Sequence, residues 1–257
     1  MERDVPIVSG ASAPSGTETF AVQWVNVVTP GEGTMLAAVA RPSGAGPFPS
    51  VLLLHGSHGF AQEYVQLAQE LAEGGLLAIA ACWFQGGRGA GVRFITPIGC
   101  PEAPPMPEAS SPEAMRTVDS LVQAARTLTG ARPDRIGLFG HSRGGGAALT
   151  YSLQGGNVQA VVLNSTGYPT ELSDLVSQAK APMLMLHGTA DSPDDGGSAA
   201  THVQMARDFE ARLREGGKPV QAVYYEGGRH NSIFASLTQR HDEVQQILTF
   251  FHRYLHL

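Results

Sequence analysis

The stretch Ile136-Gly137-Leu138-Phe139-Gly140-His141-Ser142-Arg143-Gly144 joins an apolar run to a segment of small residues. The apolar run predicts a buried β-strand, and the following residues 143–153 predict a helix rich in glycine and alanine. Gly140 to Gly144 has the form G-x-S-x-G, which is typical of a sharp strand-to-helix turn that presents a serine hydroxyl. The glycines are expected where a Cβ atom would collide with the neighbouring strand or helix. Ser142 is therefore the candidate nucleophile.

Outward from this turn, short apolar runs alternate with helical patterns. The expected strands are 51–54, 76–82, 135–139, 159–163, 183–186 and 220–225, and the expected helices are 61–73, 143–153, 199–215, 242–257 and one that opens at Ser111-Pro112. Serine as N-cap followed by proline is a strong helix start. The alternation favours an α/β fold with a mostly parallel sheet and helices on both faces.

The regions outside this alternation are the N-terminus and one internal segment. Residues 20–28 and 35–40 predict an N-terminal β-hairpin, and residues 1–16 are expected to be a loose tail. Residues 85–110 are rich in glycine and proline and show no periodicity. A segment of this length after a sheet strand is expected to border the functional site. We expect a single domain over residues 1–257.

Composition excludes several classes of protein. Of 257 residues, 42 % are hydrophobic and 16 % are charged, so the chain can bury a core. The formal net charge is −6 and there is no basic stripe, which argues against a nucleic-acid partner. The apolar runs are too short to span a membrane. The start Met1-Glu2-Arg3-Asp4 does not resemble a secretory leader, although a trimmed sequence could hide one.

The two cysteines, Cys82 and Cys100, are too few for a metal site or a disulfide framework. Cys82 lies in an apolar run and is expected to be a small, reduced core residue, with a Cys82–Cys100 bridge as the less favoured alternative. On these grounds we expect a cytoplasmic protein.

A serine nucleophile needs a base and an orienting acid. Asp191 follows the expected strand 183–186 and His230 follows the strand 220–225. Both would therefore lie at the same sheet edge as Ser142, in the order Ser, acid, His. Asp194 and Asp195 are alternative acids. The histidines at 202, 241, 252 and 256 fall on or beside expected helices, and His230, because it follows the strand 220–225, is the expected base.

The same edge supplies the other candidate contacts. Backbone N–H groups of Arg143 and Ser57, with His58 as the alternative to Ser57, are expected to form an oxyanion hole. His55 is interpreted as a structural anchor of this loop. The expected substrate contacts are His58, His141, Arg88 and Arg93; ordinary ion pairing or solvation is the alternative role for the arginines.

Four segments together resemble the dienelactone-hydrolase-like group of the α/β-hydrolase superfamily: 55–59, 134–145, 187–191 and 228–230. The resemblance covers about four-fifths of the chain. It implies an eight-stranded, mostly parallel sheet, a Ser142–Asp191–His230 triad, and no cofactor. Separately, the sequence implies no metal, because the run 191–195 lacks the ligand glutamate of an EF-hand loop.

One departure from the family's pattern bears on the substrate. Dienelactone hydrolases proper use cysteine as nucleophile, whereas this chain has Ser142. The departure favours an oxygen-ester hydrolase, a carboxylesterase acting on a small-molecule ester. A lactonase or a thioesterase is the alternative within the group, followed by a peptidase or a hydrolase-fold binding protein whose triad is idle. The oligomeric state cannot be predicted from the sequence.

Overall fold

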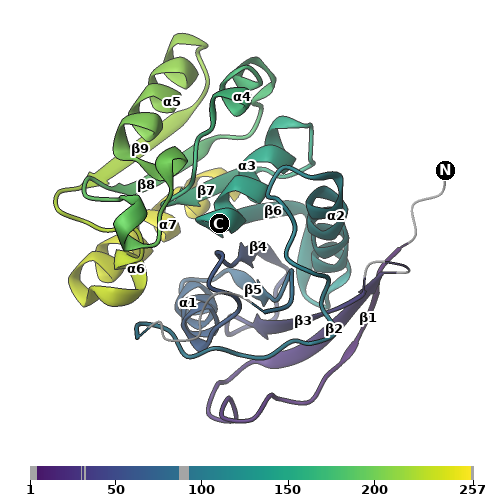
Figure 1. The fold of residues 1–257 in the computed structure, drawn as a ribbon. Coiled ribbons are helices and arrows are strands. Elements are labelled where there is room, and N and C mark those ends of the chain that lie inside the picture. Colours follow the sequence, from purple (N-terminus) through teal and green to yellow (C-terminus); the bar gives the residue numbers. More distant parts are fainter. Residues whose placement is uncertain (1–4, 30, 32, 87–92, 256–257) are drawn as a thin grey trace.

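The described strands form one nine-stranded sheet in the order β1-β2-β3-β5-β4-β6-β7-β8-β9 (Figure 1). The structure is a computed structural model that describes residues 5–29, 31, 33–86 and 93–255. The strands are β1 (Ile7–Gly10), β2 (Gln23–Thr29), β3 (Gly33–Ala40), β4 (Phe48–Leu54), β5 (Leu77–Ala81), β6 (Ala131–His141), β7 (Ala160–Asn164), β8 (Met183–Gly188) and β9 (Val220–Tyr225).

Strand direction divides the sheet into two parts. β1, β2 and β3 pair antiparallel with each other, and β3 pairs antiparallel with β5. From β5 onward the neighbours are parallel. The chain leaves β4 for β5 on one side and later returns to β6 on the other side. In such sheets the crevice outside the carboxyl ends of the strands, beside this reversal, is the usual ligand site.

The expected hairpin is confirmed, but the number of strands and the tail are not. Residues Ile7–Gly10 pair with 25–28 of β2, so this part of the expected tail is an edge strand that raises the strand count from eight to nine. The four-residue segment is too short to give a clear alternation of apolar and polar residues. Its pairing depends on the exposed edge that β2 offers.

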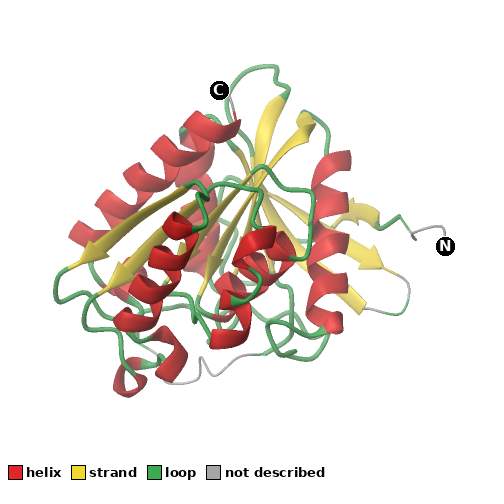
Figure 2. Cartoon of the chain, turned by 90° about the horizontal axis from the view of Figure 1, so that it is seen from above, coloured by secondary structure: helices red, strands yellow, loops and turns green. Residues whose placement is uncertain are grey.

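Helices cover both faces of the sheet, as Figure 2 shows. They are α1 (Gln62–Glu73), α2 (Pro112–Thr127), α3 (Arg143–Leu153), α4 (Thr170–Ser173), α5 (Val203–Glu215), α6 (Ser232–Ala235) and α7 (Leu237–Leu255). The helices α2, α3 and α5 pack on one face, while α1 and α7 pack on the other. The predicted start of α2 is confirmed, because the Ser111 side chain accepts the Ala114 N–H at 3.2 Å.

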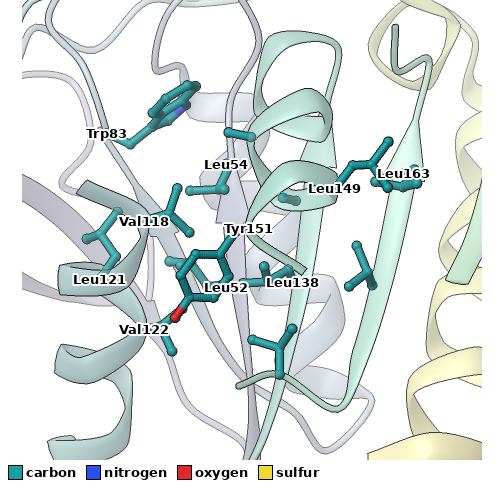
Figure 3. Packing of buried hydrophobic residues seen from close by; sticks show 14 of the residues in the cluster. Leu52, Leu54, Trp83, Val118, Leu121, Val122, Leu138, Leu149, Tyr151 and Leu163 are labelled. Atoms are coloured by element: carbon teal, nitrogen blue, oxygen red, sulfur yellow. The ribbon is translucent and has the colours of Figure 1, made fainter. Parts of the chain in front are cut away.

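Apolar burial on the two faces fixes the register of the strands. Alternate residues of β4 point to opposite faces: Leu52 and Leu54 join the cluster under α2 and α3, and Val51 and Leu53 join the cluster under α1 and α7. In Figure 3, Leu138 and Leu163 from the sheet meet Leu149 and Tyr151 of α3 within the first cluster. A one-residue slip would exchange the two faces of a strand. In the described part of the chain, no helix is both long and apolar enough to cross a membrane.

The expectation of reduced cysteines is wrong, because Cys82 and Cys100 form a disulfide bond. The bond joins the residue after β5 to the irregular segment 85–110. The same segment is hydrogen-bonded to α1: the Gln62 N–H donates to Thr96 O at 2.9 Å, and the Thr96 N–H donates to the Glu63 carboxylate at 2.9 Å. Sequence spacing alone cannot show that the segment folds back far enough to bring the two sulfurs together. Disulfides are typical of oxidising compartments, so the two cysteines no longer support a cytoplasmic location. That location stays a prediction.

Candidate active site

Ser142 occupies the turn between β6 and α3 in a strained backbone conformation, with φ 52° and ψ −116°. A non-glycine residue at positive φ is uncommon and persists only where the surroundings enforce it. Here the Ser142 N–H donates to Asn164 O at 2.9 Å, and the Gly146 N–H donates to Ser142 O at 3.0 Å. A Cβ at Gly140 would collide with the backbone of Gly144 across the turn, and a Cβ at Gly144 would collide with the main-chain oxygens of Leu54 and His55 at the end of β4, as the sequence pattern predicts.

Ser142, His230 and Asp191 are linked by hydrogen bonds. His230 Nε2 lies 2.9 Å from Ser142 Oγ, and His230 Nδ1 lies 2.8 Å from Asp191 Oδ2. A carboxylate only accepts, so Nδ1 carries the proton and Nε2 is free to accept the serine O–H. His230 and Asp191 are each 2 % exposed, so this polarised arrangement is shielded from water.

Asp191 is held from its other oxygen by a residue that the sequence did not single out. Thr201 Oγ1 donates to Asp191 Oδ1 at 2.9 Å, while its own oxygen accepts the Ser198 N–H at 2.8 Å. His187 Nε2 donates to Thr201 O at 2.6 Å and lies 3.5 Å from Asp191 Oδ2. Of the alternative acids, Asp194 is exposed on the loop beyond. Burial lowers the pKa of His187, which keeps the ring neutral beside the carboxylate.

The loop after β4 lies against the serine turn. In the described part of the chain, the N–H groups of Ser57 and Arg143 have no hydrogen-bond partner, as the expected oxyanion hole requires. The Arg143 side chain joins two walls of the site, because Nε donates to Ser57 Oγ at 3.0 Å and an Nη donates to Pro107 O at 2.6 Å. Its ion pair with Glu108 spans 3.4 Å.

A pocket of about 840 Å³ opens over Ser142 and His230. That volume is in the range of small-molecule sites. The segment 85–110 contributes Phe94, Met106 and Ala109 to its walls. Arg93 is exposed and does not line this pocket, and Arg88 lies outside the described residues. The proposed roles of both arginines stay predictions.

His58 also lines the pocket, and its tautomer follows from its neighbours. Tyr64 Oη accepts the Gly56 N–H at 3.0 Å and lies 2.9 Å from His58 Nε2. Burial raises the pKa of Tyr64 well above its usual value, so the phenol keeps its proton and donates it to Nε2. Burial, and next His141, lower the pKa of His58 to about 2, so the ring is neutral. Its one proton is therefore on Nδ1, which has no partner among the described residues.

His141 is fully buried and does not line the pocket. Its Nδ1 lies 2.6 Å from Asn164 Oδ1 and its Nε2 lies 3.1 Å from Asn231 Oδ1. The ring stands between those of His58 and His230, with centroid distances of 5.4 and 5.3 Å. This position supports a role in holding the site rather than the expected direct contact with substrate. His55, also fully buried, fits the predicted role as an anchor.

The sheet order, the strand–serine–helix turn and the flanking helices define an α/β-hydrolase fold. The model of the dienelactone hydrolase family matches residues 35–252, so the chain belongs to that family of hydrolases.

Named relatives agree with this assignment. A Bradyrhizobium protein named "Probable 2-oxo-3-(5-oxofuran-2-ylidene)propanoate lactonase" is 25 % identical over 237 residues, covering 83 % of this chain and 85 % of its own. A Methylorubrum extorquens protein named "Putative carboxymethylenebutenolidase" is 26 % identical over 207 residues, 77 % of this chain and 68 % of its own. Among solved structures, a Pyrococcus furiosus esterase has a TM-score of 0.70 at 14 % identity and covers 98 % of this chain and 99 % of its own, a likeness that shows the fold.

Proposed function

We propose that this hydrolase is a carboxylesterase that cleaves small-molecule esters through an acyl-enzyme on Ser142. The observation that carries the proposal is the hydrogen-bonded line Ser142 Oγ–His230 Nε2–His230 Nδ1–Asp191 Oδ2, with contacts of 2.9 and 2.8 Å. The line begins at a strained turn and ends on a buried carboxylate. A binding protein of this fold would have no need of this alignment.

In the proposed reaction, His230 Nε2 takes the Ser142 proton as Oγ attacks the ester carbonyl carbon. Asp191 holds His230 in the Nδ1–H tautomer and stabilises the imidazolium. The N–H groups of Arg143 and Ser57 stabilise the tetrahedral oxyanion. The imidazolium then protonates the alcohol oxygen as the C–O bond breaks. In the second half, His230 removes a proton from water as the water oxygen attacks the acyl carbon. The imidazolium then returns the proton to Ser142 Oγ as the acyl–Oγ bond breaks and the acid leaves.

The Nδ1–H of His58 is the proposed substrate contact beside this machinery. It is a single donor held in one direction by Tyr64, so it suits an acceptor oxygen of the ester rather than a cationic group. The aromatic contacts of His58 with Phe94 and Phe234 fix the plane of the ring. We therefore expect a preference for esters that carry a second acceptor oxygen, outside the reacting ester group, near the scissile bond.

A lactonase is the second candidate. Its support is the Bradyrhizobium relative, whose name states lactone hydrolysis and which aligns over most of both chains. A lactone is an internal ester, so the same residues would open it, with the leaving alcohol still attached to the acyl group.

Rates on a matched substrate panel test the proposal. Purified protein is assayed with p-nitrophenyl acetate, longer p-nitrophenyl esters, a five-membered lactone, an acyl thioester and a peptide anilide. We expect ester turnover and labelling by a fluorophosphonate probe, both lost in Ser142→Ala and both kept in the control Ser120→Ala on α2. Labelling with lactone turnover alone would favour the second candidate, and absence of both labelling and turnover would overturn the proposal.

A further inference from the structure

Behind the serine turn lies a buried carboxyl group that the mechanism above does not use. Glu243 of α7 is 1 % exposed. Its Oε2 accepts a hydrogen bond from Asn164 Nδ2 at 2.7 Å, and its Oε1 accepts one from Gln239 Nε2 at 2.7 Å. Asn164 ends β7, and its main-chain oxygen also holds the N–H of Ser142.

The chain of hydrogen bonds continues from Asn164 to the pocket. Asn164 Oδ1 contacts His141 Nδ1, and His141 Nε2 contacts the side-chain amide of Asn231, which follows His230 in sequence and lines the pocket. Side chains from α7, β7 and β6 thus connect Glu243 to the loop that carries His230.

The hydrogen-bonding protons cannot all be placed while the side-chain amides of Asn164 and Asn231 both keep their oxygens toward His141. Burial, and next His230, lower the pKa of His141 to about 4, so its ring is neutral and has one N–H. Both ring nitrogens face amide oxygens, and each oxygen can only accept. A neutral ring can donate to one of them, so either Asn164 or Asn231 must turn its amide by half a rotation.

Glu243 decides which amide turns. A carboxylate only accepts, so Asn164 keeps its NH₂ toward Glu243 and its oxygen toward His141. The proton of His141 is then on Nδ1, and Asn231 turns its NH₂ to Nε2. When Glu243 is protonated, the direction of each hydrogen bond from Glu243 to Asn231 is reversed. Because Gln239 donates to Oε1, the acid proton is on Oε2 and donates to the turned Asn164 oxygen.

In the reversed order, the Asn164 NH₂ donates to His141 Nδ1, and the Nε2–H of His141 donates to Asn231 Oδ1. We propose that Glu243 is a positioning residue whose protonation state sets the tautomer of His141 and thereby which end of the Asn231 amide faces the pocket. The oxygen faces the pocket when Glu243 is ionised, and the NH₂ faces it when Glu243 is protonated. A Cβ added at Gly196, another pocket residue, would come within 3.2 Å of Asn231 Nδ2, so the end of the amide away from His141 lies beside the pocket.

The charges around Glu243 permit the switch in an accessible pH range. Burial raises the pKa of Glu243 to about 8; Asp242 raises it further, while Gln239, Asn164 and Arg240 lower it. The charged groups beside it on α7 are Arg240, paired with Glu70 of α1 at 3.1 Å, and Asp242, which accepts from Tyr225 of β9 at 2.8 Å. Tyr225 also interacts electrostatically with Glu243, and Asn164 lies between Glu243 and His141.

The test reads the tautomer directly. Long-range ¹H–¹⁵N correlation spectra of histidine-labelled protein are recorded from pH 6 to pH 10, with His141 assigned by the signals lost in His141→Gln. We expect Nε2–H at low pH and Nδ1–H at high pH, with a midpoint near pH 8. Glu243→Gln is expected to remove the transition, and the control Glu73→Gln, at the exposed end of α1, is expected to keep it.

A single tautomer throughout the range in the wild type, or an unchanged transition in Glu243→Gln, would overturn the inference. The kinetic arm rests on the proposed function: KM for p-nitrophenyl acetate should shift across the same midpoint in the wild type and stay flat in Glu243→Gln. An inactive protein whose His141 still switches would contradict the proposed function and leave this inference standing.

Discussion

Thr201 Oγ1 donates a hydrogen bond to Asp191 on the oxygen opposite His230, at 2.9 Å. Both oxygens of this carboxylate are therefore engaged, and its plane is fixed relative to the imidazole. The sequence distance between the two residues is short, yet a 3₁₀ turn over Ala199–Thr201, with Ser198 as its N-cap, must form to bring the hydroxyl into place.

Replacing Thr201 by valine should reduce kcat/KM. The variant keeps the shape of the side chain and removes a hydrogen bond to a charged group, so we expect a loss of about 10-fold, or ~1.5 kcal/mol. The control Thr201→Ser retains the hydroxyl and should stay near wild-type activity. Equal losses in the two variants would show that packing of the methyl group, rather than the hydrogen bond, is what matters.

Replacing Asp191 by asparagine should cost far more. The amide NH₂ would favour the wrong tautomer of His230, and a loss in kcat of about 10³–10⁴-fold is expected from this effect. Asp194→Asn, on the same loop, should leave kcat unchanged. If the two variants exchanged these results, the acid would have to be reassigned to Asp194. Steady-state rates on p-nitrophenyl acetate measure both.

Tyr64→Phe tests the control of the His58 tautomer. The variant removes the proton donor to Nε2 and leaves the Gly56 N–H unpaired in a buried place, which costs about 1–3 kcal/mol of stability. We expect KM to rise more for oxygen-rich esters than for simple alkyl esters. Tyr254→Phe on α7 is the control. An equal change in KM for both ester types would count against a His58 contact.

We expect reduction of the Cys82–Cys100 disulfide to lower the free energy of unfolding substantially. Cys82 and Cys100 are 18 residues apart, and a loop of this length is expected to contribute about 3 kcal/mol to the free energy of unfolding. Urea denaturation should show this loss in Cys82→Ser/Cys100→Ser and in reduced wild type alike. Two titratable thiols in the unreduced, denatured protein would contradict the bond.

Glu243 should make stability depend on pH. Its pKa is near 8 in the folded protein and near 4.5 in the unfolded chain, so between these values the folded state holds the proton more tightly. The resulting stabilisation is present below the unfolded pKa and is lost as pH rises through the folded value, at up to about 1.4 kcal/mol per pH unit. Urea midpoints should fall over this range in the wild type and fall less in Glu243→Gln.

The parts of the site that depend on local sequence were the predictable ones. The strand-to-helix turn at Ser142 is encoded by glycines within two residues of it, and Asp191 and His230 follow from their place after apolar strands. The pairing of Asn164 with Glu243 spans 79 residues and depends on how α7 lies across the sheet. No pattern in either segment indicates it. The same holds for Thr201 and Tyr64, whose hydroxyls are ordinary until the chain folds.

Errors in the fold prediction have a similar origin. The edge strand Ile7–Gly10 and the Cys82–Cys100 bond both depend on a distant partner, whereas boundaries within the α/β alternation, such as α3 and β9, follow from periodicity and agree with the structure.

The segment between β5 and α2 is attached to the rest of the protein at separate points: Thr96 O accepts the Gln62 N–H of α1, Glu102 O accepts the Thr34 N–H of β3, and Pro107 O accepts an N–H of the Arg143 guanidinium. It lines the pocket but contributes none of Ser142, Asp191 and His230. Substitutions at Met106 or Ala109 can therefore reshape the cavity while the reacting groups keep their alignment. For laboratory evolution, this segment is the place where substrate range can be altered separately from chemistry.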